Sequence, residues 1–384
     1  MNLLNKFRKF LANPRRYLNR RSLYEVSRSV FHSLPTGGRA FAPSVVAIVP
    51  TPGCNARCAM CDIGQRVKDS AWIRQLKGSS DSPPLTIDQW KAVIDQLSTF
   101  RPGVAFAGGE PYLYPHILEL CEYLHRKTLD YSNTTNGLLL EQYAEDSVRY
   151  GMACLQVSLL GPPRIHDTAT GVDGAFNQVI RGIQKLVEAK ARLGKSMPKI
   201  IINCPMFQAN YRHLEEFAGI LKDIRGVSSI MFTHQYARTL DMVEKHKNHF
   251  GTDYPVVATT DTADLRDVDT TVLLRQLRAV HDILEGKPFL IRPSLTPEQT
   301  RMWYDNPSVF IPGHEKCSSV FSSSLIAANG DVLTPLTFCV NCVFGNVGEQ
   351  PLLKIWNNGK YRRFRKILRK GPFPVCARCC GVVI

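Results

Sequence analysis

The sequence contains no run of about eighteen apolar residues, the length that a transmembrane helix needs. Its first residues also lack the apolar segment and the small-residue cleavage site of a secretory signal peptide. We therefore expect a cytoplasmic protein. In that reducing compartment twelve cysteines are not expected to form a disulfide framework. Their clustering at 54–61 and 317–380 indicates metal or cluster ligation, while the isolated Cys121, Cys154 and Cys204 are predicted core residues.

Acidic residues are almost absent from two segments. Residues 1–34 contain eight Lys and Arg against the single acid Glu25, and residues 354–370 contain eight with no acid. Together they account for the whole formal net charge of +15. The first eleven residues place apolar side chains on one helical face, so residues 1–44 are predicted to form a basic amphipathic arm and linker. Such an arm is typical of proteins that lie peripherally on an anionic membrane surface, here the inner face. The alternative is a solvated or subunit-contacting surface, and nucleic acid is not an expected partner because no nucleic-acid motif occurs.

Six short β-branched runs alternate with helical patterns. They are residues 45–49, 103–109, 131–137, 153–159, 199–205 and 228–234. Strands joined by helical crossovers predict a parallel sheet, and six units are two short of a closed barrel. The fold class is therefore α/β, with a partial (β/α)6 barrel over residues 45–300. A small C-terminal domain of short strands, glycine turns and cysteines follows at 301–384.

Three cysteines follow the first predicted strand in the stretch TPGCNARCAMCDIG. Cys54, Cys58 and Cys61 have the spacing C-x3-C-x2-C, and no fourth ligand lies nearby. A structural zinc site normally takes four ligands. A [4Fe-4S] cluster has four irons, so three thiolates leave one iron open to a small molecule.

This loop, GGEP at 108–111 after the second strand, and VSLLGPPRIHDTATGVDGAF at 157–176 resemble the radical S-adenosylmethionine (SAM) superfamily. The resemblance implies that Cys54, Cys58 and Cys61 ligate a [4Fe-4S] cluster and that SAM chelates its open iron. It also implies SAM contacts by a further set of residues, in which Met60 replaces a frequent aromatic residue. These are Met60, Gly108, Gly109, Glu110, Asn136, Ser158 and Asn203.

The resemblance further implies an activity. The reduced cluster cleaves SAM to methionine and a 5′-deoxyadenosyl radical, which abstracts hydrogen from a substrate. A reducing partner such as ferredoxin or flavodoxin supplies the electron. The competing interpretation is a non-catalytic metal-binding protein that retains this fold.

The C-terminal cysteines resemble the SPASM or twitch extension of radical SAM enzymes, which holds auxiliary iron–sulfur clusters. The resemblance implies one auxiliary [4Fe-4S] cluster, with Cys317, Cys339, Cys376 and Cys379 as the best four ligands. Cys342 is an alternative to Cys339, and the role of Cys380 stays open. The competing interpretation is a zinc site built from the pairs Cys339 with Cys342 and Cys376 with Cys379.

The sequence gives less information about the substrate than about the cofactors. The basic arm favours a lipid or membrane-associated substrate, and the SPASM resemblance favours a peptide or protein as the alternative. His166, Asp167, His234 and Gln235 lie near predicted strand ends but are expected to be structural. No catalytic residue on the substrate side is identified.

Overall fold

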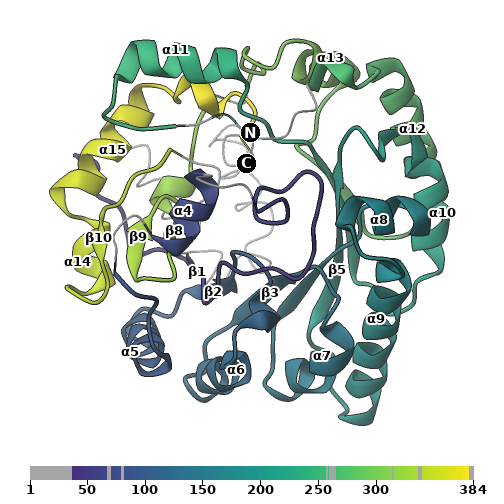
Figure 1. Ribbon diagram of the computed structural model, residues 1–384, viewed down its shortest axis with the longest axis horizontal. Coiled ribbons are helices and arrows are strands. Elements are labelled where there is room, and N and C mark those ends of the chain that lie inside the picture. Colours follow the sequence, from purple (N-terminus) through teal and green to yellow (C-terminus); the bar gives the residue numbers. More distant parts are fainter. Residues whose placement is uncertain are drawn as a thin grey trace, which may run out of the picture.

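The computed structural model describes residues 37–66, 71–78, 82–256, 258, 265–313, 315–335 and 340–379. They form one ten-stranded sheet in the order β10-β9-β8-β1-β2-β3-β4-β5-β6-β7 (Figure 1). The strands are β1 (Val45–Ile48), β2 (Gly103–Phe106), β3 (Tyr131–Thr135), β4 (Cys154–Ser158), β5 (Lys199–Met206), β6 (Ser229–His234), β7 (Phe289–Arg292), β8 (Ser323–Ile326), β9 (Asp331–Leu333) and β10 (Gly345–Asn346). Most of the predicted arm, residues 1–36, lies outside the described residues.

Helices connect the strands from β1 to β7, and each of these strands is parallel to the next. The helices are α4 (Ala71–Lys77), α5 (Ile87–Ser98), α6 (Ile117–Arg126), α7 (Leu140–Arg149), α8 (Pro163–Thr170), α9 (Ala175–Arg192), α10 (Leu214–Asp223), α11 (Leu240–Phe250), α12 (Thr270–Ile283), α13 (Pro297–Asp305), α14 (Leu352–Trp356) and α15 (Gly359–Lys370). Figure 1 shows α5, α6, α7, α9, α10 and α12 along the outer side of the curved sheet. Their apolar faces and the sheet share one core.

Helix α5 illustrates how the sequence specifies these elements. Thr86 and Gln89 form a capping box, in which each side chain accepts a hydrogen bond from the other residue's backbone amide. The apolar residues then recur at helical spacing, so that Trp90, Ile94 and Leu97 are fully buried. The helix therefore begins where the cap satisfies its free amides, and its apolar face fixes how it packs.

The predicted α/β class with a parallel sheet is confirmed, and the sheet extends further than the six predicted strands. β7 was missed because half-buried and exposed residues alternate along Phe289–Arg292, which leaves no buried apolar run. On the other side, β8 pairs in parallel with β1, and β9 and β10 follow as antiparallel strands. The C-terminal residues thus continue the same sheet. Among the described helices, none is both long and apolar enough to cross a bilayer.

Candidate active site

The carboxyl ends of β1 to β6 open into a cavity of about 410 Å³. Parallel strands end at one edge of a sheet, so the loops that follow them gather there. Residues from the loops after β1 to β6 contribute to the wall. The lining residues are Cys54, Cys58, Met60, Cys61, Asp62, Gly109, Thr134, Thr135, Asn136, Ser158, Leu160, Thr170, Asn203, Pro205, Phe207, Met231, Thr233, His234, Gln235, Tyr236, Arg238 and Ala258. The three cysteines and most residues implied for SAM contact therefore share one cavity.

The cysteine loop is held in place by its backbone. The amide of Arg57 donates to the carbonyl of Thr170 at 2.7 Å, and the amide of Ala59 donates to that of Ala169 at 2.9 Å. These bonds fasten the loop to the end of α8. The Gln65 side chain also donates to the carbonyl of Cys58 at 3.0 Å. The cysteine side chains are thus free to face the cavity while the chain between them stays fixed.

Burial dominates the electrostatics of these thiols. It raises the pKa of Cys58 to about 12, and the neighbouring Cys61 and Cys54 add to the effect. Burial likewise raises the pKa of Cys54 and of Cys61. Thiols in such surroundings become thiolates only beside a strong positive charge, and metal coordination supplies one. The three thiols lie in one concave wall, and no fourth cysteine among the described residues lines it, which fits a cluster with one open iron. In the part of the chain that the structure describes, no three His, Cys, Asp or Glu side chains are grouped closely enough for a single ion.

Gly108 and Gly109 bring the loop after β2 against the cysteine loop. Gly108 has φ +111°, and a Cβ on Gly109 would lie 1.9 Å from the carbonyl oxygen of Gly53. The amide of Glu110 donates to that same oxygen at 2.8 Å. The two loops therefore touch backbone to backbone, which only glycine permits at position 109. This contact is one reason for the two glycines, and the approach to SAM implied by the resemblance stays a prediction.

Glu110 is fully buried beside the cavity. Its carboxylate accepts hydrogen bonds from the Asn136 amide at 2.8 Å, the Thr135 hydroxyl at 2.9 Å and the Tyr112 amide at 3.1 Å. Burial nevertheless raises the pKa of Glu110 to about 7, against these donors. A cation placed near this carboxylate would lower its pKa again.

Asn136 links the end of β3 to the cysteine loop. Its side-chain Nδ2 donates to Oδ1 of Asn55 at 2.8 Å and lies 3.6 Å from Sγ of Cys54. Ser158 and Asn203 are register partners at the ends of β4 and β5. The structure thus brings Met60, Gly109, Asn136, Ser158 and Asn203 into the same wall, with Glu110 behind it.

The second cysteine group is partly described. Cys376 and Cys342 are each 7% exposed, and Cys317 and Cys379 are half-buried. Cys317 and Cys379 are close enough that the charge of one raises the pKa of the other, although burial is the larger cause of the raised pKa, about 11, of Cys317. Cys339 and Cys380 lie outside the described residues, so the choice among Cys339, Cys342 and Cys380 stays open.

Arg378 anchors the turn between Cys376 and Cys379. Its buried guanidinium donates to carbonyl oxygens at the end of α13, among them those of Trp303 at 2.6 Å and Met302 at 2.7 Å. The backbone carbonyl of Trp303 thus lies next to the cysteine turn. The indole Nε1 of the same residue donates to the carbonyl of Gln235 at 3.1 Å. One helix therefore contacts both the cysteine turn and the cavity wall.

Comparisons with known proteins agree with this geometry. Residues 48–221 match the model of the radical SAM superfamily, and residues 317–380 match that of the SPASM iron–sulfur cluster-binding domain. The AdoMet-dependent heme synthase of Methanosarcina barkeri is 31% identical over 344 residues, which cover 85% of each chain. The chain belongs to the radical SAM superfamily. Radical SAM and SPASM domains bind SAM and [4Fe-4S] clusters, as predicted.

Matches to other relatives also cover most of this radical SAM chain. The Fe-coproporphyrin III synthase of M. barkeri is 26% identical over 345 residues, covering 86% of this chain and 78% of that protein. Among solved structures, Streptococcus suis SuiB bound to S-adenosylmethionine has a TM-score of 0.58 at 17% identity, covering 90% and 72% of the two chains. The solved structure of anSMEcpe with bound AdoMet has a TM-score of 0.59 at 19% identity, covering 85% of this chain and 81% of that chain. These two structures support the fold assignment.

The sequence did not identify the wall that follows β6. His234 and Gln235 were expected to be structural, yet both line the cavity, together with Tyr236 and Arg238. The ring of His234 is only 1% exposed, and burial lowers its pKa to about 3, so it is neutral at physiological pH. His166, by contrast, does serve the fold, because its Nδ1 accepts from the Leu160 amide at 3.0 Å. Neither histidine belongs to a recognisable motif. The sequence therefore could not distinguish a His that lines the cavity from one that only stabilises the fold.

Proposed function

We propose that this chain is a radical SAM enzyme whose cluster is ligated by Cys54, Cys58 and Cys61. The observation that carries the proposal is the shared cavity, which these thiols line together with Asn136, Ser158 and Asn203. The bound cluster and SAM would supply a 5′-deoxyadenosyl radical for hydrogen abstraction. The protein residues of the site would bind these cofactors and orient the substrate against them.

The residues around the cavity divide that work. With the SAM ammonium nearby, Glu110 would be held in its charged form, and Asn136 ties this carboxylate to the cysteine loop. Ser158 and Asn203 offer polar groups at the ends of adjacent strands. The apolar side chains of Leu160, Phe207 and Met231 line the same cavity and keep water from it. SAM would thus lie over the ends of β1 to β5, which leaves the wall after β6 for the substrate.

We also propose one auxiliary [4Fe-4S] cluster in the SPASM domain. Its proposed ligands in the described part of the chain are Cys317, Cys376 and Cys379. Cys342 or Cys339 would be the fourth. The nearness of Cys317 to Cys379 supports this assignment, and so does the anchored turn that carries Cys376 and Cys379. Zinc at the paired cysteines is the alternative, and metal analysis of the reconstituted protein distinguishes the two.

For the substrate, we propose a cofactor precursor, with a tetrapyrrole as the first case. The M. barkeri relatives that match most of the chain are named as a heme synthase and an Fe-coproporphyrin III synthase. A third relative, from Pyrococcus furiosus, is named as a protein that modifies the cofactor of an aldehyde oxidoreductase. The lipid prediction depends on residues 1–34, which lie outside the described part, and stays a prediction, as does the membrane-peripheral location.

The substrate proposal is tested by incubating the anaerobically reconstituted enzyme with SAM, dithionite and Fe-coproporphyrin III. A tetrapyrrole substrate is consumed in step with 5′-deoxyadenosine, whereas an unrelated compound leaves the slow uncoupled cleavage of SAM unchanged. Deuterium transfer from labelled tetrapyrrole into 5′-deoxyadenosine would establish direct hydrogen abstraction. SAM cleavage without tetrapyrrole consumption would refute the substrate class and leave the enzyme assignment standing.

A further inference from the structure

Helix α15 carries cations of two kinds. Three of them serve the fold. The buried Arg365 donates to the carbonyl of Val320 at 2.8 Å, Arg362 donates to that of Gly37 at 3.2 Å, and Arg369 lies over the ring of Phe321 at 5.1 Å. These side chains join the helix to the rest of the domain. Their positive charge is therefore explained by internal contacts.

The other cations on this helix face solvent. They are Lys360, Arg363, Lys366 and Lys370, and Lys354 adds a fifth on the preceding α14. The spacing of three, three and four residues places the four on one helical face, opposite the buried Tyr361, Phe364 and Leu368. We call these five residues the basic stripe.

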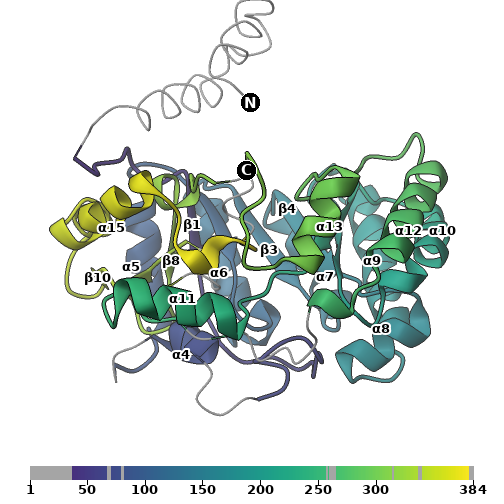
Figure 2. The same cartoon turned by 90° about the horizontal axis from the view of Figure 1, so that it is seen from above.

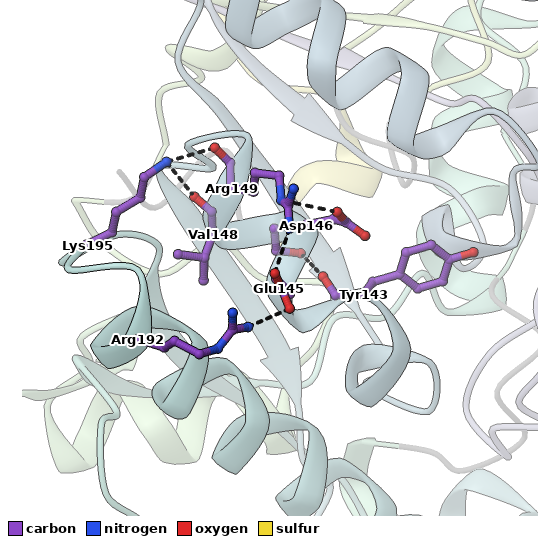
Figure 3. Close-up of polar contacts among 8 residues, drawn as sticks. Tyr143, Glu145, Asp146, Val148, Arg149, Arg192 and Lys195 are labelled. Atoms are coloured by element: carbon purple, nitrogen blue, oxygen red, sulfur yellow. Dashed lines mark hydrogen bonds and ion pairs between the residues drawn. The ribbon is translucent and has the colours of Figure 1, made fainter.

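No ion pair within the described residues involves the basic stripe. Like charges at this spacing destabilise a helix by about 0.2–0.5 kcal/mol per pair. Helices α7 and α9 carry acidic residues beside their cations. Figure 3 shows Glu145 on α7 between Arg149 of the same helix and Arg192 of α9, with nitrogen–oxygen distances of 2.6 and 2.5 Å. Helix α15 has no acidic residue, so the basic stripe has no such partner on its own helix, which is the pattern expected of a surface that meets an anionic partner.

The basic stripe lies beside the auxiliary cysteines. Lys360 is close enough to Cys342 for its charge to act on the thiol, in opposition to the burial that raises the pKa of Cys342 to about 11. At its other end α15 leads through Phe373 into Cys376 and Cys379. The basic stripe therefore flanks a part of the surface where an electron could enter a cluster of the SPASM domain.

We infer that the basic stripe docks an acidic one-electron carrier protein, which delivers electrons beside the auxiliary cysteines. The inference rests on the proposed function, because only a reductive reaction needs such a partner. Charge complementarity selects the partner: a carrier with a negative surface around its redox centre is steered to this face. The electron leaves the reduced carrier, which becomes oxidised by one unit, and reduces an iron–sulfur cluster by one unit.

The test compares two triple variants with the same change in net charge. Lys360→Glu/Arg363→Glu/Lys366→Glu reverses the centre of the basic stripe. The control, Lys222→Glu/Arg275→Glu/Arg278→Glu, changes exposed cations on α10 and α12. Figures 1 and 2 show these two helices at the opposite side of the molecule from α15. All six side chains are exposed, so both variants should fold.

The measured quantity is the dissociation constant of an acidic flavodoxin, titrated at low and high salt. We expect at least about tenfold weaker binding to the α15 variant at low salt, no change for the control, and convergence at high salt. Equal binding by the two variants would overturn the inference. So would a loss of binding to vesicles with anionic lipids while flavodoxin binding is unchanged, since the basic stripe would then be a lipid surface.

A second measurement separates this inference from the proposed function. With dithionite, which needs no docking site, wild type and both variants should form 5′-deoxyadenosine from SAM at equal rates. With reduced flavodoxin, only the α15 variant should be slower. If the wild type forms none with dithionite, the proposed function fails, and the binding titration still decides whether the basic stripe is a docking surface.

Discussion

The hydroxyl of Tyr304 on α13 lies 2.9 Å from Nδ1 of His234, at the end of β6. The same hydroxyl is within hydrogen-bond reach of the Gln235 backbone amide, which can only donate. A phenol can donate one proton while it accepts, so we expect Tyr304 to accept from Gln235 and to donate to Nδ1. The ring proton of His234 would then lie on Nε2. The neutral ring of His234 lines the cavity wall after β6, where Tyr304 fixes its orientation.

Tyr304→Phe should destabilise the fold and release this tautomer. Removing the hydroxyl leaves Nδ1 of a buried ring without its partner, which costs about 1–2 kcal/mol of unfolding free energy. Chemical denaturation measures the loss. Tyr123→Phe is the control, because its hydroxyl bonds to Asp95 at the surface, where the expected loss is smaller. Nitrogen-15 NMR should show both His234 tautomers in Tyr304→Phe, and an unchanged spectrum would contradict the assignment.

Acid should destabilise the protein through His234. Burial lowers the pKa of this ring to about 3, whereas the unfolded chain binds a proton near 6.5. Below pH 6.5 the unfolded state therefore binds more protons than the native state. The free energy of unfolding decreases as the pH is lowered through this range. His234→Phe removes this contribution. The stability difference between variant and wild type should shift in favour of the variant by about 3 kcal/mol between pH 7 and pH 4. An equal difference at both pH values would show that the ring is accessible to protons.

Gly109→Ala should separate the cysteine loop from the loop that follows β2. The added Cβ would lie 1.9 Å from the Gly53 carbonyl oxygen, which belongs to the backbone and cannot turn aside. We expect a loss of about 1–3 kcal/mol in stability, with reduced iron uptake by the cysteine loop.

Gly219→Ala is the matched control for that substitution. Nothing lies within 4 Å of its added Cβ, and the residue is inside α10. A gain of about 0.5–1 kcal/mol is expected, because alanine is the better helix former. Similar effects of the two substitutions would mean that the loop contact is unimportant.

Cys379→Ala should remove the auxiliary cluster alone. Each [4Fe-4S] cluster contributes four irons, so the content should fall from about eight to about four per chain, while cleavage of SAM at the first cluster is retained. Cys154→Ala is the control, since this half-buried thiol belongs to β4 and to neither cysteine group. Four irons in the wild type, with zinc present, would favour the zinc site.

The sequence predicted the parts of the protein in which chemistry and periodicity coincide. The cysteine spacing, the two glycines of GGEP and the six short strand-forming runs could be recognised, because each requires particular residue types at fixed positions. β7 and the wall after β6 were not. The strand Phe289–Arg292 has no fully buried face, and His234 gains its role only from α13, whose Tyr304 lies 70 residues away. Contacts of that kind depend on packing and leave no local pattern.

The sequence also did not show which cations of α15 are buried and which are exposed. The sequence showed eight cations and no acid over residues 354–370, which predicted a basic surface as a whole. The structure shows that Arg365 is completely buried and stacks on Trp356 and Tyr361, at 4.0 and 4.1 Å. Part of the basic segment therefore stabilises the domain, and only the outward face remains for a partner.

Cys54, Cys58 and Cys61 are proposed to hold the cluster at which SAM is cleaved. The most direct measurement is the formation of 5′-deoxyadenosine by the anaerobically reconstituted protein with SAM and dithionite, followed by chromatography. Wild type should form it, and Cys58→Ala should form none while retaining the iron of the auxiliary site. Absence of product from wild type that holds its full iron content, or equal product from Cys58→Ala, would contradict the account.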